Sequence, residues 1–388
     1  MMKRTLAAIV IATAASGCSH QPTLHVGPSA LERSSCSSIN LVNHGHSIFG
    51  KNLDNTYETQ GLILINKRGI VRTSPYVGTT GARAQWISRY ASVSFSFVHA
   101  GFVWTGMNEK GLAISMMGIP EIQGPPPDAR PPLEDGLWIQ YMLDNCVTVA
   151  DVVEAARDFR IITVDHYHIA DRNGDSAVFE CLGGEERFFT GDEAPISVLT
   201  NSTYGDSIRD WEEFIIQPFP PPNGSIERFR IAAQRLQDFT PRDQTAAVDY
   251  LFDTLHAIRS EWINGYPNTT QWSFVFDTES HQVFFRTYSY PGIKNFNLGD
   301  FDLMCSDPVK MLSVQTPGSG DVSGAFTDLT AEAAYDHFRH FLESFLGQHP
   351  SQEQIEAVVE YYLGFPCRDP MRVPRRASRR AQANVPGT

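Results

Sequence analysis

Alternation of apolar and polar residues predicts a strand-rich first half of the chain. Residues 37–43 alternate, turn at residues 43–45 and resume at residues 46–50, a pattern typical of a β-hairpin. A second hairpin is predicted from residues 62–66 and 70–73. Further on, valine and phenylalanine alternate with serine over residues 93–97, as in a strand with one buried face.

The pattern changes to helical periodicity after these strands. Residues 137–144 and 148–158 are candidate helices, and Thr148, with Asp151 three residues later, is a candidate cap of the second. Strands return over residues 166–200, two helices follow, and a last hairpin is predicted over residues 272–288. Because strands and helices form separate clusters, we expect an α+β domain with antiparallel sheets over residues 36–305, not a doubly wound parallel sheet.

The C-terminal part has a different pattern. Residues 306–327, rich in glycine, proline and serine at their centre, are predicted to be a linker. Residues 328–366 are predicted to form a helical hairpin whose second helix starts at a capping box of Ser351 and Gln354. We expect this hairpin to pack on the body; mediating a homo-oligomer is the alternative. Residues 367–388 are expected to be a basic, disordered tail.

The N-terminus resembles an export signal. Lys3 and Arg4 precede an apolar stretch over residues 6–15 that is too short to span a bilayer. We expect residues 1–18 to be a signal peptide and residues 19–35 a propeptide, which places the protein in the periplasm or outside the cell. Residues 15–18 are similar to a lipobox, so lipidation of Cys18 would give a transient membrane association; an ordinary cleavage site at residues 12–14 is the alternative.

Composition and charge exclude some functions. The chain has 388 residues, 42% of them hydrophobic, and a formal net charge of −13, which argues against nucleic acid as a partner. No cofactor is expected, and no metal either, because the histidine pairs at residues 166 and 168 and at residues 337 and 340 lack carboxylates to complete a site. A disulfide among the last four cysteines is left open; these are Cys146, Cys181, Cys305 and Cys367.

Cys36 is the candidate nucleophile. It follows the predicted propeptide, begins a predicted strand and is flanked by serines on both sides. If the chain is cut between Ser35 and Cys36, this cysteine gains a free α-amine, whose pKa of about 8 lets it act as a base near neutral pH. One residue would then supply both nucleophile and base.

Six short motifs, in order, resemble the choloylglycine hydrolase and penicillin V acylase family. They are Cys-Ser-Ser at residue 36, Phe-Gly-Lys-Asn-Leu-Asp at residues 49–54, Gly-Met-Asn-Glu-Lys-Gly-Leu at residues 106–112, Asp-Asn-Cys-Val-Thr-Val at residues 144–149, Val-Leu-Thr-Asn at residues 198–201 and Glu-Arg-Phe-Arg at residues 227–230. The resemblance spans roughly residues 36–303.

This resemblance implies a four-layer αββα fold of the N-terminal-nucleophile type, in which self-cleavage makes Cys36 the mature N-terminus. It implies that the thiol of Cys36 attacks a linear amide and that Asp54 binds the α-amine. Asn201 would donate to the oxyanion, and Arg228 would complete the polar network of the site. The implied partner is a small-molecule N-acyl amide, and the resemblance also favours a homo-oligomer.

Two positions depart from the family's pattern. Lys51 stands where the family usually has arginine, which keeps the charge but loses the planar fork. Gly118 stands where the family has an asparagine or tyrosine whose backbone N–H is the second oxyanion donor. Glycine can still supply that N–H but no side chain to the pocket.

The sequence therefore predicts an exported, self-processing hydrolase of N-acyl amides. The acyl group is left open between a bile acid, phenoxyacetyl and the acyl chain of a homoserine lactone. Two alternatives remain: an acyltransferase that uses the same thioester, and an inactive envelope lipoprotein that binds ligands in the same pocket.

Overall fold

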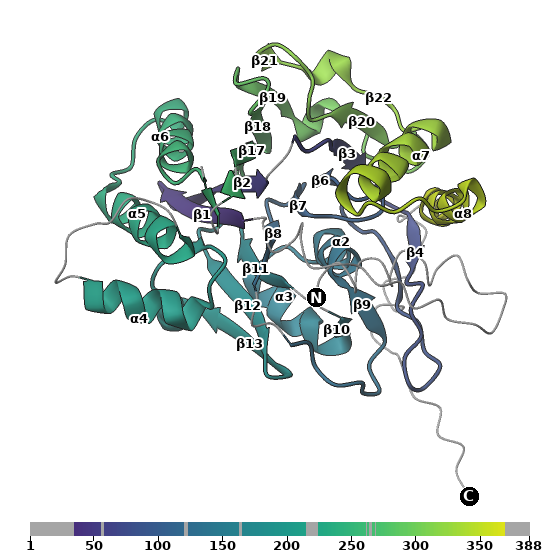
Figure 1. The fold of residues 1–388 in the computed structure, drawn as a ribbon, viewed down its shortest axis with the longest axis horizontal. Helices are drawn as coiled ribbons and strands as arrows, with labels where there is room; N and C mark the ends of the chain where they lie inside the picture. The colour runs from purple at the N-terminus through teal and green to yellow at the C-terminus, as the bar shows by residue number, and fades with distance from the viewer. Residues whose placement is uncertain are drawn as a thin grey trace, which may run out of the picture.

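The fold is built on two β-sheets packed face to face (Figure 1). The computed structural model describes residues 35–55, 58–119, 123–162, 165–214, 224–260, 262–263, 266–267 and 269–368. The first sheet has seven strands, antiparallel apart from the last pair. Their order is β14 (Val198–Leu199), β1 (Ser35–Asn43), β2 (His46–Asn55), β17 (Thr269–Asp277), β18 (Gln282–Thr287), β19 (Lys294–Asn297) and β21 (Gly320–Asp321).

The second sheet has nine strands, and its described pairings are antiparallel. Their order is β13 (Glu185–Thr190), β12 (Ser176–Leu182), β11 (Asp165–Ala170), β8 (Ala113–Gly118), β7 (Thr105–Asn108), β6 (Ser92–Ser96), β3 (Leu62–Asn66), β20 (Lys310–Ser313) and β22 (Thr327–Asp328). Side chains of the two sheets meet in the core, where the rings of Phe95 and Phe274 lie 3.9 Å apart between centroids.

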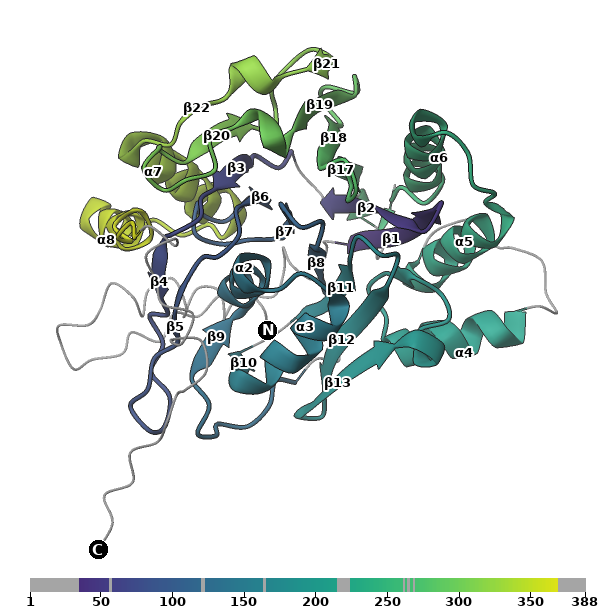
Figure 2. The same cartoon turned by 180° about the vertical axis from the view of Figure 1, so that it is seen from behind.

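Helices cover the outer face of each sheet (Figures 1 and 2). On the first sheet lie α5 (Ser225–Asp238) and α6 (Gln244–Ala257), and on the second lie α2 (Asp135–Asn145) and α3 (Val149–Ala155). Gly50 of β2 permits the close approach of α6, since a Cβ there would lie 2.9 Å from the side chain of Leu251. The expected α+β class and the four-layer αββα arrangement are confirmed.

Shorter elements complete the described fold. They are β4 (Val71–Thr73) with β5 (Gln85–Ile87), β9 (Pro132–Glu134) with β10 (Arg160–Ile162), β15 (Trp262–Ile263) with β16 (Tyr266–Pro267), the helix α4 (Tyr204–Phe214), and the 3-10 helices η1 (Ala156–Asp158), η2 (Gly191–Glu193), η3 (Leu298–Asp300) and η4 (Ser323–Ala325). In the part of the chain that the structure describes, no helix is long and apolar enough to cross a membrane.

Local sequence signals are confirmed where they act within one element. The first predicted hairpin is β1 and β2, and its turn uses positive φ angles at His44 and Gly45. Thr148 and Asp151 form the expected capping box of α3. The second predicted hairpin is wrong, because β3 pairs with β6 and β20 whereas β4 pairs with β5. The apolar run of residues 62–66 is buried on both faces, so it occupies the interior of the large sheet.

The C-terminal helical hairpin packs on the body. It consists of α7 (Ala331–His340), a π-helical turn η5 (Phe341–Phe345) and α8 (Gln352–Leu363), which starts at the expected capping box of Ser351 and Gln354. Phe341 and Phe345 lie against Phe97, with ring centroids 5.8 and 5.6 Å away. The range predicted as a linker contains β20, β21 and the start of β22, so the chain adds strands to both sheets before it reaches the hairpin.

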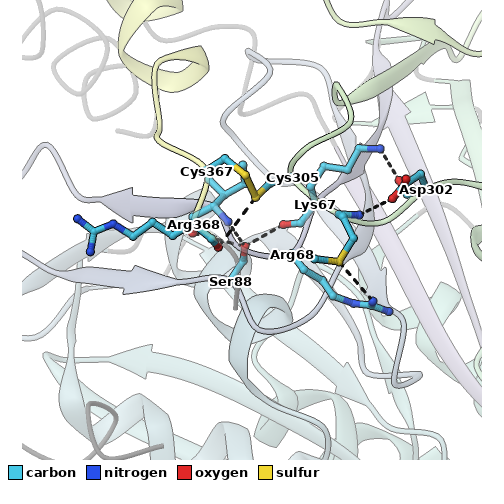
Figure 3. Close-up of a disulfide and its surroundings, with 9 residues drawn as sticks. Lys67, Arg68, Ser88, Asp302, Cys305, Cys367 and Arg368 are labelled. Carbon is cyan, nitrogen blue, oxygen red and sulfur yellow. Dashed lines mark hydrogen bonds between the residues drawn. A yellow bond between two sulfur atoms is a disulfide. The ribbon is translucent and has the colours of Figure 1, made fainter. Parts of the chain in front are cut away.

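A disulfide joins the end of this hairpin to the body (Figure 3). Cys305 and Cys367 are bonded across a sequence separation of 62 residues. The backbone on both sides of the disulfide hydrogen-bonds to the segment between β3 and β4. The N–H of Cys305 donates to the carbonyl of Arg68, and the N–H of Arg368 donates to the carbonyl of Gly69. The pairing that the sequence left open is therefore Cys305 with Cys367, while Cys36, Cys146 and Cys181 are free thiols.

We expect removal of this disulfide to destabilise the protein. Replacing both Cys305 and Cys367 by serine should lower the free energy of unfolding by about 4 kcal/mol, because a cross-link over a loop of this length restricts the unfolded chain. Urea unfolding with and without dithiothreitol measures the effect. The reductant should lower the stability of the wild-type chain and leave that of the double variant unchanged; a wild-type stability insensitive to reductant would contradict the prediction.

Candidate active site

Cys36 is held at both ends of its own backbone. It lies on β1 opposite Leu53 of β2 and is 2% exposed. Its N–H donates to Oδ1 of Asn201 at 2.8 Å, and its carbonyl oxygen accepts from Nη1 of Arg228 at 2.6 Å. The candidate nucleophile is therefore fixed by two of the residues that the sequence singled out.

Arg228 is the centre of the polar network. Its helix α5 packs on β1, and the guanidinium is buried. Beyond the carbonyl of Cys36, Nη1 donates to Oγ of Ser37 at 2.5 Å, and Nη2 donates to Oδ1 of Asn201 at 2.9 Å. Nη1 also lies 3.7 Å from Oδ2 of Asp54. One cation thus orients the cysteine backbone, the asparagine amide and the carboxylate together.

Asp54 lies near the end of β2, in the part of the strand that pairs with the start of β1. Its carboxylate is buried and accepts a hydrogen bond of 2.5 Å from Oγ1 of Thr270, on the neighbouring strand β17. This hydroxyl and the guanidinium of Arg228 approach different oxygens of the carboxylate. Together they fix its orientation beside the backbone of Cys36.

Asn201 follows β14 and faces the end of β8. Its Nδ2 donates to the carbonyl oxygen of Gly118 at 2.7 Å, while its Oδ1 accepts from Cys36 and Arg228. A side-chain amide has two N–H donors, so the second remains available in this geometry for an oxyanion. Gly118 is thus placed next to Asn201, and the contact between them uses its carbonyl rather than its N–H.

The turn that carries Asn201 is anchored from two sides. The N–H of Asn201 donates to Oγ of Ser225, the first residue of α5, at 2.8 Å. On the other side, Nε2 of His166 lies 2.7 Å from the carbonyl oxygen of Thr200, and Nδ1 lies 3.0 Å from Oε1 of Glu180. Because a carbonyl oxygen only accepts, Nε2 carries the proton of this contact.

Lys51 lies on the face of the ribbon of β1 and β2 that meets the second sheet. It is fully buried, its Nζ donates to the carbonyl oxygen of Met116 on β8, and the same nitrogen lies 5.4 Å from the ring centroid of Trp104. Burial lowers the pKa of Lys51 to about 8, against the opposing influence of Cys36 and Asp165. An arginine at this position would stay charged.

The thiol of Cys36 is shifted in the opposite direction. Burial raises its pKa to about 11, although the positive charge of Lys51 works against this rise. A cysteine in this environment, still joined to Ser35 by a peptide bond, is protonated at neutral pH. Its attack on a carbonyl therefore requires a proton acceptor.

The comparisons with known proteins give this arrangement a family. The family model described as linear amide C–N hydrolases, choloylglycine hydrolase family, matches residues 36–233, just over half of the chain, and its match begins at Cys36. The chain belongs to this family of linear amide C–N hydrolases.

Individual relatives agree with the family. The chain is 28% identical over 251 residues to a penicillin V acylase from Pectobacterium atrosepticum, an alignment that covers 54% of this chain and 66% of that protein, just under two thirds of its length. A penicillin V acylase structure from Agrobacterium tumefaciens superposes with a TM-score of 0.68 at 23% identity, covering 76% of this chain and 98% of that chain. A mutant of the conjugated bile acid hydrolase from Clostridium perfringens gives a TM-score of 0.61 at 18% identity, over 74% and 99%. The N-terminal-nucleophile hydrolase fold is thereby confirmed.

The structure brings the motif residues of this choloylglycine hydrolase family member into one site. Cys36, Asp54, Asn201 and Arg228 share the network described above, and Lys51, on the other face of β2, acts electrostatically on the thiol of the same cysteine. Their catalytic roles stay predictions.

The sequence did not predict several residues that hold the site residues in place. Thr270, Ser225 and Glu180 lie in none of the six motifs, and their contacts depend on long-range pairing. His166 was considered only as half of a metal pair. Across the described residues, no group of three or more His, Cys, Asp or Glu side chains could hold a metal ion.

We expect removal of the guanidinium of Arg228 to destabilise the protein strongly. Arg228→Met leaves the buried carboxylate of Asp54 without its cation, which should cost about 3 kcal/mol of unfolding free energy. The matched control is Arg230→Met on the same helix. Arg230 pairs with Asp210 at 2.5 and 2.6 Å in a more exposed position, so its loss should cost about 1 kcal/mol. Urea unfolding compares the two; equal losses would contradict the assignment of Arg228 as the buried centre.

Proposed function

We propose that this member of the linear amide hydrolases is an exported enzyme that cleaves its own Ser35–Cys36 bond and then hydrolyses a small N-acyl amide through a thioester on Cys36. The observation that carries this proposal is the fixation of Cys36 at both its nitrogen and its carbonyl by Asn201 and Arg228. Holding both ends of one residue suits a reaction in which its nitrogen and its thiol act together. The family match that begins at Cys36 supports the same reading.

In the proposed turnover, the α-amine of Cys36 takes the thiol proton and the sulfur attacks the acyl carbonyl. The free N–H of Asn201 donates to the oxyanion, a contact typically worth about 3 kcal/mol of the barrier. The α-amine then passes its proton to the leaving amine, and water hydrolyses the thioester by the reverse sequence. Asp54 and Arg228 hold the α-amine and the backbone of Cys36 in place throughout.

The chemistry of the acyl group is proposed from the relatives. The names of the penicillin V acylases and of the conjugated bile acid hydrolase point to penicillin V and conjugated bile acids as the substrates to test first. Gly118, which supplies no side chain beside Asn201, leaves more room there than the residue usual in the family. Lipidation at Cys18 stays a prediction that lies outside the described residues; cleavage before Cys36 would release the enzyme from such an anchor.

Self-cleavage is tested by the mass of the purified chain. Full-length protein should yield a chain that starts at Cys36, and Cys36→Ala should stay uncleaved at this bond and inactive, because the nucleophile is absent. N-terminal sequencing and intact mass spectrometry measure both. An intact Ser35–Cys36 bond in active protein would contradict the proposal.

The oxyanion role is tested by Asn201→Ala. Loss of the side-chain amide should lower kcat by about 10²- to 10³-fold, because it removes one donor to the developing negative charge. The matched control is Asn145→Ala, at the end of α2, whose amide donates to the carbonyl of Tyr141. It should leave kcat within twofold. Equal kcat losses in the two variants would exclude the assigned role.

The substrate class is tested with three linear amides: a phenoxyacetyl amide, a conjugated bile acid and an N-acyl homoserine lactone. We expect turnover of at least one of them, with release of its amine measured by chromatography. Added hydroxylamine distinguishes the alternatives, since an acyltransferase would form the hydroxamate faster than the acid. A folded, thiol-intact protein that hydrolyses none of the three would favour the ligand-binding alternative.

A further inference from the structure

The intact chain poses a chemical problem that the mature enzyme does not have. Before cleavage, the nitrogen of Cys36 is part of a peptide bond and donates its hydrogen to Asn201. An amide nitrogen has no basic lone pair, so the α-amine that serves as base in turnover does not yet exist. Some other group must accept the thiol proton for the first cut.

The alternation of side chains along β2 indicates which group can do so. Cys36 lies opposite Leu53, and residues directly opposite in an antiparallel pair point to the same face. Lys51 is two residues from Leu53 and shares this face, while Asp54 and Ser37 point to the other one. The contacts agree: Lys51 reaches Met116 in the second sheet, whereas Ser37 meets Arg228 on the helix side.

Lys51 is therefore a diagonal cross-strand neighbour of Cys36, a separation that long side chains span. The other charged and titratable groups near the pair are engaged. Asp54 binds Thr270 and Arg228 on the helix side. His168 of β11 faces the same inter-sheet space, but its Nδ1 is 2.7 Å from Ser38 and its Nε2 is 3.1 Å from Ser197.

The acidic groups behind Lys51 complete its surroundings. Asp165 of β11 and Asp54 of β2 both favour the charged ammonium, and Asp135 of α2 interacts in turn with Asp165. Arg228 acts on the thiol from the helix side. Burial and the neighbouring Asp135 raise the pKa of Asp165 well above its usual range. The charges that would flank a thiolate and an ammonium formed by this transfer are therefore Arg228, which acts on Cys36, and Asp54, which acts on Lys51.

We propose that Lys51 is the proton acceptor for self-cleavage, a role that the family's arginine cannot fill because a guanidinium keeps its proton. The proposal rests on the proposed self-processing. Neutral Lys51 takes the Sγ proton, and Sγ bonds to the carbonyl carbon of Ser35. The carbon–nitrogen bond then breaks as the ammonium of Lys51 returns the proton to the departing nitrogen. Water hydrolyses the resulting thioester, which leaves a carboxylate on Ser35 and a free α-amine and thiol on Cys36.

The pH dependence follows from the charge state of this lysine. Only the neutral amine accepts a proton, and burial holds the pKa of Lys51 at about 8. The rate of self-cleavage should therefore rise tenfold per pH unit below pH 8 and level off above it. Full-length chain made by cell-free translation at pH 6.5 and moved to buffers between pH 6.5 and 10 gives this profile, with cleavage followed by mass spectrometry.

Lys51→Arg keeps the positive charge and removes the proton acceptor. It should cleave about 100-fold more slowly at pH 8, with a rate that rises up to pH 10 without levelling off. Lys67→Arg is the matched control, because Lys67 is equally buried but binds the carbonyl of Asp302 near the disulfide (Figure 3). It should cleave with the wild-type rate and profile.

Lys51→Ala supplies a second test that does not depend on fitting an arginine. Methylamine should restore its cleavage in proportion to the concentration of the neutral amine. Three outcomes would each overturn the proposal. The first is a wild-type rate and pH profile in folded Lys51→Arg, and the second is the absence of amine rescue in folded Lys51→Ala. The third is a wild-type cleavage rate that is independent of pH between 7 and 9. A wild-type chain that never cleaves would instead overturn the proposed self-processing itself.

Discussion

The site depends on one buried cation. The guanidinium of Arg228 lies where little water reaches it, so its donors must find acceptors within the protein. Those acceptors are the carbonyl of Cys36, the hydroxyl of Ser37 and the amide of Asn201, with the carboxylate of Asp54 beside them. They belong to β1, to β2 and to the turn after β14. Satisfying this ion therefore fixes the relative positions of one helix and three segments of the first sheet.

The two faces of the ribbon of β1 and β2 have different chemistry. The helix side holds the ionic network around Arg228, while on the inter-sheet side Cys36 and Lys51 are both buried. Burial on that side raises the pKa of the thiol to about 11 and lowers that of the lysine to about 8. The period of two along a strand produces this separation. Neighbouring residues such as Ser37 and Ser38 consequently serve different networks.

The sequence predicted an element correctly where neighbouring residues determine its structure. It also identified residues that lie together in the structure where they belong to a family motif, even if they contact distant parts of the chain. The hairpin of β1 and β2 and the caps at Thr148 and Ser351 are set by neighbouring residues. The prediction failed for the partner of β3. The two adjacent runs at residues 62–66 and 70–73 suggest a hairpin, but β3 lies inside the large sheet, where it pairs with β6. The contact of Thr270 with Asp54 was equally hidden, since it depends on a strand register across more than 200 residues.

The C-terminal hairpin is coupled to the active site through packed rings. Nζ of Lys51 lies 5.4 Å from the ring centroid of Trp104, which contacts Phe97 at 4.5 Å, and Phe97 in turn lies against Phe341 of the hairpin. The disulfide at Cys367 holds the far end of the hairpin to the segment between β3 and β4. The rings that connect Lys51 to the hairpin therefore link residues 290 positions apart in the sequence, Lys51 and Phe341. The hairpin thus packs against the far side of the rings that lie next to Lys51.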